Sequence, residues 1–130
     1  MAVYTAKMEQ GYSSGGRVKT TSITATGTDS VRWERSVADA AADEELDIPE
    51  ITQANITSLY LLSTQDVTLK TNSSSVPTDT IELKANRGYW WDADDYNTCL
   101  LTGDITANVF ATNASGGTAV ITFEATLTEP

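Results

Sequence analysis

The sequence predicts an all-β protein, an antiparallel β-sandwich that is jelly-roll-like and has little helix. Two observations lead to this prediction. Apolar residues recur at every second position in several short segments, the spacing that places alternate side chains on one face of a strand. Turn-forming residues separate these segments at short intervals. The pattern predicts seven to nine strands arranged in sheets that pack face to face.

The length of the chain is typical of one domain. A compact chain of 130 residues hides roughly two-thirds of the surface that it exposes when unfolded. We therefore expect a single β-sandwich domain over residues 1–130, with residues 1–16 as a candidate N-terminal arm.

The first strands are predicted from the N-terminal quarter of the chain. Tyr4, Ala6 and Met8 alternate with more polar residues over 2–9, which predicts a strand. The glycine-rich segment 11–16 predicts a hairpin turn. A phosphate-binding loop is disfavoured, because the segment lacks the Gly-Lys-Ser/Thr ending of such loops and no helix pattern follows it. Residues 17–27 are rich in threonine and β-branched side chains, which favour a second strand.

The next segment combines a strand signal with the best helix-forming composition in the chain. Val31 and Trp33 lie two positions apart and continue the sheet after a turn. Residues 36–46 favour a short surface helix or an extended loop, and Pro49 prevents continuation. The five carboxylates of this region lack the spacing of a calcium loop and indicate a solvated acidic face. They are Asp39, Asp43, Glu44, Glu45 and Asp47.

The C-terminal half predicts two similar hairpins. Residues 56–63 and 67–71 are expected to pair around a short turn. Residues 104–112 and 118–127 are expected to pair around the turn-rich linker 113–117. Between the two hairpins, 80–85 predicts a strand with Ile81 and Leu83 inward. The last strand has the cleanest alternation, with the following residues on its inner face: Ala119, Ile121, Phe123, Ala125 and Leu127.

Charge and hydropathy limit the classes of partner. The chain has 18 acidic and 8 basic side chains, a formal charge of −10. Such a surface repels phosphate backbones and anionic lipid headgroups. No apolar run approaches the roughly 20 residues that cross a bilayer as a helix. We therefore expect no nucleic-acid partner and no membrane partner.

The composition also disfavours catalysis. The chain contains no histidine, which removes Ser-His-Asp and Cys-His nucleophile systems and the commonest zinc ligand. The single cysteine, Cys99, forms no internal disulfide and is expected to be a small buried hydrophobic residue. We expect no enzyme, no cofactor, no catalytic residues and no metal-binding residues.

Residues 89–96 combine aromatic and acidic side chains. Trp90 and Trp91 are adjacent, so in a strand they point to opposite faces and at most one joins the core. Three interpretations remain open for this stretch: a sugar-binding surface, a protein interface, or a structural cap in which an indole N–H bonds to a loop carbonyl. Calcium binding by Asp92, Asp94 and Asp95 has no distinctive spacing to support it.

Three segments carry a resemblance to a known class of proteins. They run from Leu59 to Ser75, from Asp79 to Ala85 and from Val109 to Thr122, and they are rich in Thr, Asn, Ser and Gly. This half of the chain resembles small β-rich virion proteins of tailed bacteriophages, some of which are capsid cement or decoration proteins. The resemblance implies a jelly-roll-like fold, a role in the particle, and assembly as a trimer on capsomer junctions.

The functional expectation is therefore a phage virion structural protein, a capsid decoration or cement protein on the outer capsid surface. Its expected partners are copies of itself and the major capsid protein, and an acidic exterior agrees with that location. The residues expected at the interface are Tyr4, Met8, Tyr89, Trp90, Trp91 and Tyr96. Two alternatives stay open: a carbohydrate-binding or receptor-binding module that uses the stretch from Tyr89 to Tyr96, and a tail or head-completion protein.

Overall fold

Two four-stranded antiparallel sheets form the body of the protein. The structure is a computed structural model that describes residues 3–128, apart from the side chains of Ser14 and Val18. In this range it has ten strands and one short 3₁₀ helix, η1. The elements are β1 (Tyr4–Ser14), β2 (Arg17–Gly27), β3 (Asp29–Val37), β4 (Ala41–Leu46), η1 (Gln53–Asn55), β5 (Ile56–Ser63), β6 (Val67–Thr71), β7 (Thr80–Leu83), β8 (Tyr89–Asp92), β9 (Val109–Asn113) and β10 (Ala119–Leu127).

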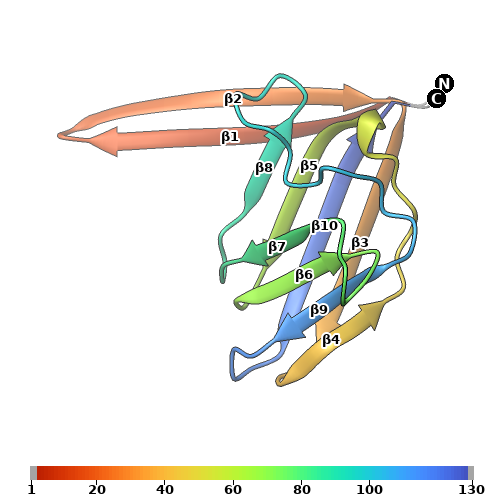
Figure 1. Cartoon of the computed structure of the whole chain (residues 1–130). Coiled ribbons are helices and arrows are strands. Elements are labelled where there is room, and N and C mark those ends of the chain that lie inside the picture. The colour runs from red at the N-terminus through yellow and green to blue at the C-terminus, as the bar shows by residue number, and fades with distance from the viewer. Residues whose placement is uncertain (1–2, 129–130) are drawn as a thin grey trace.

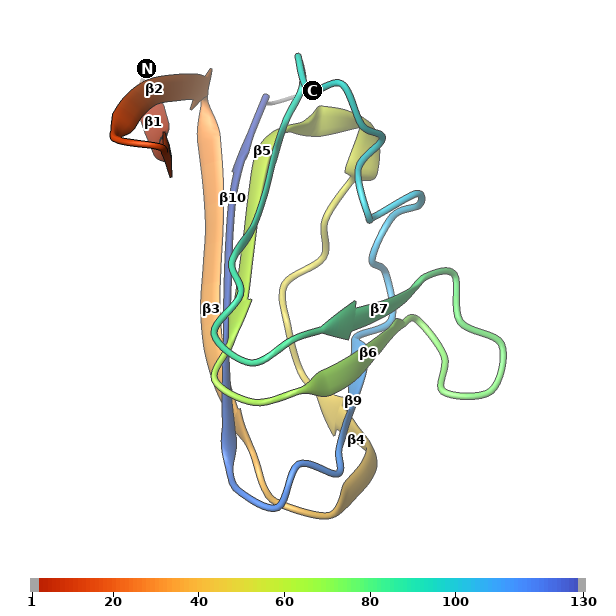
Figure 2. The same ribbon diagram turned by 90° about the vertical axis from the view of Figure 1, so that its left-hand side faces the viewer.

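The strands fall into three antiparallel groups. One sheet has the order β3-β10-β5-β8 and the other has the order β4-β9-β6-β7. Among the residues that the structure describes, β1 and β2 pair only with each other. We call the β1–β2 hairpin, residues 4–27, the arm, and residues 28–128 the body. Figure 2 shows that the arm lies on the outer side of the sheet that contains β3, β10 and β5, which we call the arm-side sheet.

The prediction of an all-β antiparallel sandwich is confirmed. The pairs in the body are nested along the sequence: β3 with β10, β4 with β9, β5 with β8 and β6 with β7. This nesting is compatible with the connectivity of an eight-stranded jelly roll. It also means that the chain passes between the two sheets at most of its turns.

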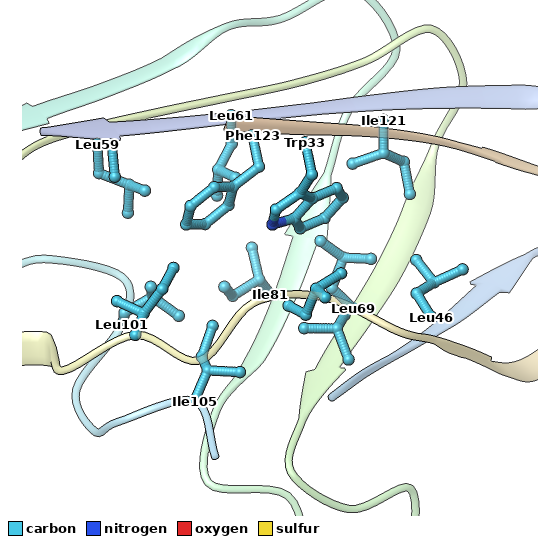
Figure 3. Packing of buried hydrophobic residues seen from close by; sticks show 14 of the residues in the cluster. Trp33, Leu46, Leu59, Leu61, Leu69, Ile81, Leu101, Ile105, Ile121 and Phe123 are labelled. Atoms are coloured by element: carbon cyan, nitrogen blue, oxygen red, sulfur yellow. The ribbon is translucent and has the colours of Figure 1, made fainter. Parts of the chain in front are cut away.

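The core lies between the two sheets, and its centre is a stacked aromatic pair. The rings of Trp33 and Phe123 are 5.1 Å apart at their centroids and 5° from parallel. Leu59 and Leu61 pack beside them from the arm-side sheet, and Ile81 faces them from the opposite sheet (Figure 3). The predicted inner face of the last strand is confirmed, because all five alternating residues from Ala119 to Leu127 are buried.

Both predicted hairpins of the C-terminal half are wrong. The strands β5 and β6 belong to different sheets, and so do β9 and β10. Each short turn therefore carries the chain from one sheet to the other, and the two strands that it joins pair with other strands. The strand β9 also begins only at Val109, because Asn108 has a φ of 68° and interrupts the alternation that began at Ile105.

The acidic segment is also different from the expectation. Residues 41–46 form the edge strand β4 and no helix. Leu46 is buried in the core, so tertiary packing overrides the helix-forming composition. A register shift between Ala41 and Glu44, with Asp43 at a φ of 48°, bends this strand along the edge of the sheet.

The first strand is longer than expected and its turn is tighter. β1 continues through Gly11 to Ser14, and the reversal uses only Gly15 and Gly16. Both glycines have positive φ, 59° and 80°, which matches the backbone that a two-residue hairpin loop requires. The strands over 17–27, 29–37 and 80–83 agree with the predicted segments.

One long connection, residues 93–108, is held in place by side chains of the loop between β6 and β7. Both carboxylate oxygens of Asp79 accept hydrogen bonds from Thr102, at 2.9 Å from its N–H and 2.6 Å from its hydroxyl. The amide of Asn72 donates to the carbonyl of Asp104 and accepts from the N–H of Thr106, each at 2.8 Å. The connection is therefore ordered by specific polar contacts, although it forms no long strand.

Candidate functional site: the arm and the aromatic end of the sandwich

The arm has no hydrophobic core of its own. Its two strands pair over eleven positions, from Tyr4 opposite Gly27 to Ser14 opposite Arg17. All members of the buried core cluster lie in the body. Figure 1 shows the arm crossing one end of the arm-side sheet and continuing past β8. An isolated two-stranded ribbon is at best marginally stable in water. A ribbon that extends from the body in this way is typical of a segment that contacts another molecule.

The two faces of the arm differ in polarity. Cross-strand partners lie on the same face of an antiparallel pair. Met8 pairs with Ile23 and Ala6 pairs with Ala25, and all four are half-buried against the body. The other face carries mainly threonine, serine and charged side chains, which are exposed. The apolar face of the arm therefore covers part of the arm-side sheet.

A groove of about 590 Å³ lies between the arm and the outer face of this sheet. Tyr4 and Met8 line it from β1, and Tyr60 and Trp90 line it from β5 and β8. We call this space the arm groove. Three residues expected at an interface, Tyr4, Met8 and Trp90, thus come together from distant parts of the sequence.

The floor of the arm groove carries one ion pair. Nε of Arg32 lies 2.8 Å from a carboxylate oxygen of Glu124, and both residues line the groove. Both side chains are largely solvent-exposed, so the pair contributes little to stability. The groove therefore offers aromatic surface beside polar groups, the mixture found where proteins contact other macromolecules.

Trp90 and Trp91 point to opposite faces of β8, as the sequence predicts. Trp90 faces the arm groove, and its indole N–H donates to a carboxylate oxygen of Asp92 at 3.2 Å. Trp91 packs against the core, and its indole N–H donates to the carbonyl of Asn97 at 2.8 Å. Trp91 thus has the geometry of the structural cap considered above, and Trp90 is left for contact.

Tyr89 is held by a similar polar contact. Its ring packs against the core, and its hydroxyl accepts a hydrogen bond from the N–H of Leu100 at 3.2 Å. The pKa of the Tyr89 hydroxyl is raised, chiefly by burial; the hydrogen bond from Leu100 opposes the rise, and the negative charges of Asp95 and of the Cys99 thiolate, which forms only at high pH, add to it. Burial likewise raises the pKa of the Cys99 thiol, so this cysteine stays in its unreactive protonated form at neutral pH.

Tyr96 is separate from the groove and fully exposed. It lies in the loop after β8, where Asp92 accepts the N–H of Asp94 at 2.9 Å and Asp95 accepts the N–H of Asn97 at 3.0 Å. Carboxylates that accept local N–H groups stabilise a turn. Within residues 3–128, no group of three or more His, Cys, Asp or Glu side chains is arranged to hold a metal ion.

Another hollow, of about 450 Å³, opens at the turns of β6, β7 and β9. Gln65, Glu82 and Ser115 are among its lining residues, and none of the expected interface residues lines it. The arm groove is therefore the hollow that gathers candidate residues.

Sequence reasoning missed several residues of the arm groove. Tyr60 alternates with the core residues Leu59 and Leu61, so the sequence predicts that its side chain points outward. Its contact with Trp90 depends on the pairing of β5 with β8. Arg32 and Glu124 meet because β3 pairs with β10. No local signal identifies such partners, since they lie far apart in the sequence.

Comparisons with protein-family models, curated proteins and solved structures gave no significant match for this chain. Across the part of the chain that the structure describes, none of the helical segments is long and apolar enough to cross a bilayer.

Proposed function

We propose that this protein is a non-enzymatic structural protein of a phage virion, a decoration or cement protein on the outer capsid surface. One observation supports it most: the chain devotes residues 4–27 to an arm with no core, held over a groove lined by Trp90 and Tyr60. The resemblance of three segments, 59–75, 79–85 and 109–122, to phage virion proteins is the reason for proposing a place in the virion. We further propose that the sandwich is a jelly roll and that the protein assembles as a trimer.

The proposed mechanism is preferential binding to the assembled shell. The protein would contact neighbouring copies of the major capsid protein at once, through the arm groove and the arm. Anything that binds an assembled state better than its free subunits stabilises that state by mass action. Buried aromatic side chains at the centre of such an interface supply most of the binding free energy. Trp90 has this role in the proposal.

Co-sedimentation with assembled capsid shells tests the proposal. Trp90→Ala should weaken shell binding about thirtyfold, because truncating a central aromatic anchor typically costs about 2 kcal/mol. Val76→Ala is the matched control, since Val76 is exposed on a loop outside the arm groove. Binding of the unaltered protein to free capsid subunits as tightly as to shells, or equal binding by Trp90→Ala and unaltered protein, contradicts the proposal.

A second candidate function is carbohydrate or receptor binding at the loop after β8. The observation in its favour is the fully exposed ring of Tyr96 in the same loop as Asp94 and Asp95. Exposed aromatic rings beside hydrogen-bond acceptors are suited to sugars. Calorimetric titration with glycans, on the unaltered protein and Tyr96→Ala, separates the two functions. Saccharide binding that the substitution abolishes favours this candidate over the cement role.

The tail or head-completion alternative differs from the cement proposal only in its place on the particle. Imaging of the assembled virion distinguishes them by position and ring stoichiometry.

A further inference from the structure

The arm and the body carry opposite charge. The arm holds three of the eight basic residues of the chain, Lys7, Arg17 and Lys19, and one of its eighteen acidic residues, Glu9. Its net charge is therefore +2, and the remainder of the chain carries −12. A positive ribbon on a strongly negative protein is attracted to the negative surface of any further copy.

The outer half of the arm, residues 10–21, is the part that is free to make such a contact. Every residue there whose side chain is described is exposed. Tyr12 is 73% exposed and lies opposite Lys19 on the continuation of the apolar face that begins with Met8. With about 3.4 Å per residue the arm is roughly 35 Å long. Figure 1 shows its tip beyond β8, away from the body.

Within the described residues, the basic groups at the tip have no acidic partner. Lys7 pairs with Glu9 at 3.2 Å within the arm. Of residues 3–128, none forms an ion pair with Arg17 or Lys19. Two positive charges and an exposed tyrosine ring therefore lie together on an element that has no core to stabilise it.

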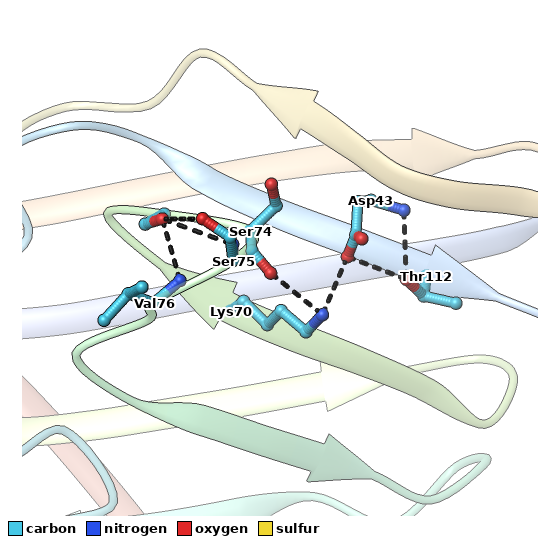
Figure 4. A network of polar contacts seen from close by, with 7 residues as sticks. Asp43, Lys70, Ser74, Ser75, Val76 and Thr112 are labelled. Carbon is cyan, nitrogen blue, oxygen red and sulfur yellow. Dashed lines mark hydrogen bonds and ion pairs between the residues drawn. The ribbon is translucent and has the colours of Figure 1, made fainter.

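The body presents a matching acidic strip that begins in β4 and continues into the loop after it. Glu44, Asp47 and Glu50 lie within seven consecutive positions and are exposed. Their neighbour Asp43 is already neutralised, because Nζ of Lys70 lies 3.2 Å from its carboxylate (Figure 4). No ion pair holds the other three within the described range. We call residues 43–50 the acidic edge.

The acidic edge also has an open side for backbone contact. β4 is the last strand of its sheet and pairs only with β9. Edge strands present unpaired N–H and C=O groups, and exposed charges along them keep unsuited partners away. A partner of opposite charge is instead favoured there.

We propose that the outer half of the arm docks on the acidic edge of a second copy of this chain. Arg17 and Lys19 lie against Glu44, Asp47 and Glu50 of that copy, and Tyr12 adds buried aromatic area. The contact orders an arm that is marginal alone. This inference specifies which surfaces join two copies in the self-association of the proposed function. It rests on that self-association only, because it requires no capsid.

Paired charge reversals in the purified full-length protein test it. The tip reversal is Arg17→Glu with Lys19→Glu, and the edge reversal is Glu44→Lys with Glu50→Lys. Lys84→Glu with Arg87→Glu is the control, because it changes net charge as the tip reversal does at exposed body positions outside both surfaces. Molar mass is measured by light scattering and sedimentation velocity at about 0.05 M and about 0.5 M salt, where screening differs strongly.

The unaltered protein and the control should associate at low salt and dissociate at high salt. Each reversal alone should raise the dissociation constant about tenfold or more, because like charges then face each other. An equimolar mixture of the two reversed proteins should associate again, since each tip then meets an edge of opposite charge.

A monomeric unaltered protein at low salt overturns the proposal. So does association that persists after the tip reversal, or a mixture that stays monomeric while circular dichroism shows both proteins folded. These measurements contain no capsid shell, so they do not test the cement role, which the Trp90→Ala experiment tests separately. A failure of shell binding would likewise not contradict the docking of the arm on a second copy.

Discussion

Asn113 ties two turns of the sandwich together through one fully buried side chain. Its amide nitrogen lies 3.0 Å, 3.2 Å and 2.8 Å from the carbonyl oxygens of Val37, Ala38 and Gly117. Its amide oxygen accepts the N–H and the hydroxyl of Ser115, at 3.1 Å and 2.7 Å. The turn after β3 and the turn after β9 therefore depend on the same amide, which the surrounding groups almost saturate with hydrogen bonds.

Replacement of this amide should be costly. Asn113→Ala should lower the free energy of unfolding by about 2–4 kcal/mol, because the buried carbonyl of Val37 and several part-buried polar groups lose this partner. Urea unfolding followed by tryptophan fluorescence measures the change. Asn97→Ala is the matched control, since Asn97 is exposed, and it should change stability by less than about 0.5 kcal/mol. Equal losses in the two variants would show that burial of the Asn113 amide is not the cause.

The strands themselves follow from the sequence, but their partners do not. The alternation over residues 119–127 identifies β10 and its inner face, because burial of alternate side chains is a local property. The pairing of β10 with β3 and β5 has no local signal. The short turns next to β5 and β10 predicted hairpins, yet such turns also connect the two layers of a sandwich. The strands on either side of such a turn have the same hydrophobic pattern in a hairpin and in a connection between layers.

β4 shows a different limit of local reasoning. Its composition favours a helix, but Leu46 enters the core and the backbone of Glu45 pairs with Phe110 of β9. The free energy of burying the apolar side chain and completing the sheet exceeds the small difference in intrinsic propensity. Local sequence patterns do not reveal this gain in free energy, since it depends on a strand more than sixty positions away.

The arm is anchored to the body by one crowded glycine. A Cβ atom on Gly27 would lie 2.5 Å from the carbonyl oxygen and 2.8 Å from the nitrogen of Leu127. The next residue, Thr28, donates its N–H to the same carbonyl at 2.8 Å. The close approach fixes how the end of β2 lies against the end of β10, and only glycine leaves room for it.

Gly27→Ala should therefore displace the root of the arm. We expect a loss of about 1 kcal/mol in the free energy of unfolding, at the lower end of the usual cost of inserting an atom into packed surroundings, because the arm can move away from the body. Amide chemical shifts of β1 and β2 should move as well, because the arm changes its angle to the body. Gly11→Ala is the control within the same arm: its Cβ would meet only the Lys19 carbonyl, at 4.0 Å. Wild-type stability and shifts in Gly27→Ala would contradict the anchoring role.

At the scale of the whole molecule, stability and contact are assigned to different segments. The core cluster is drawn from Trp33 to Leu127, within the body. The arm contributes the basic ribbon and one wall of the arm groove. The sequence predicted that Tyr4, Met8 and Trp90 belong to an interface. It could not predict that they share one groove, because the position of the arm over β8 is set by tertiary contacts at its root.

This division predicts that the body folds without the arm. Deletion of residues 1–27 should lower the free energy of unfolding by about 1 kcal/mol or less, since the half-buried contacts of Met8 and Ile23 are few and partly hydrated. Urea unfolding should remain a single cooperative transition, and far-ultraviolet circular dichroism should stay that of a β protein. Leu59→Ala in the full chain calibrates the measurement, because emptying this fully buried site should cost about 2–5 kcal/mol. Self-association at low salt should disappear with the arm. A truncated body with loose tertiary structure would show that the arm is part of the folding unit.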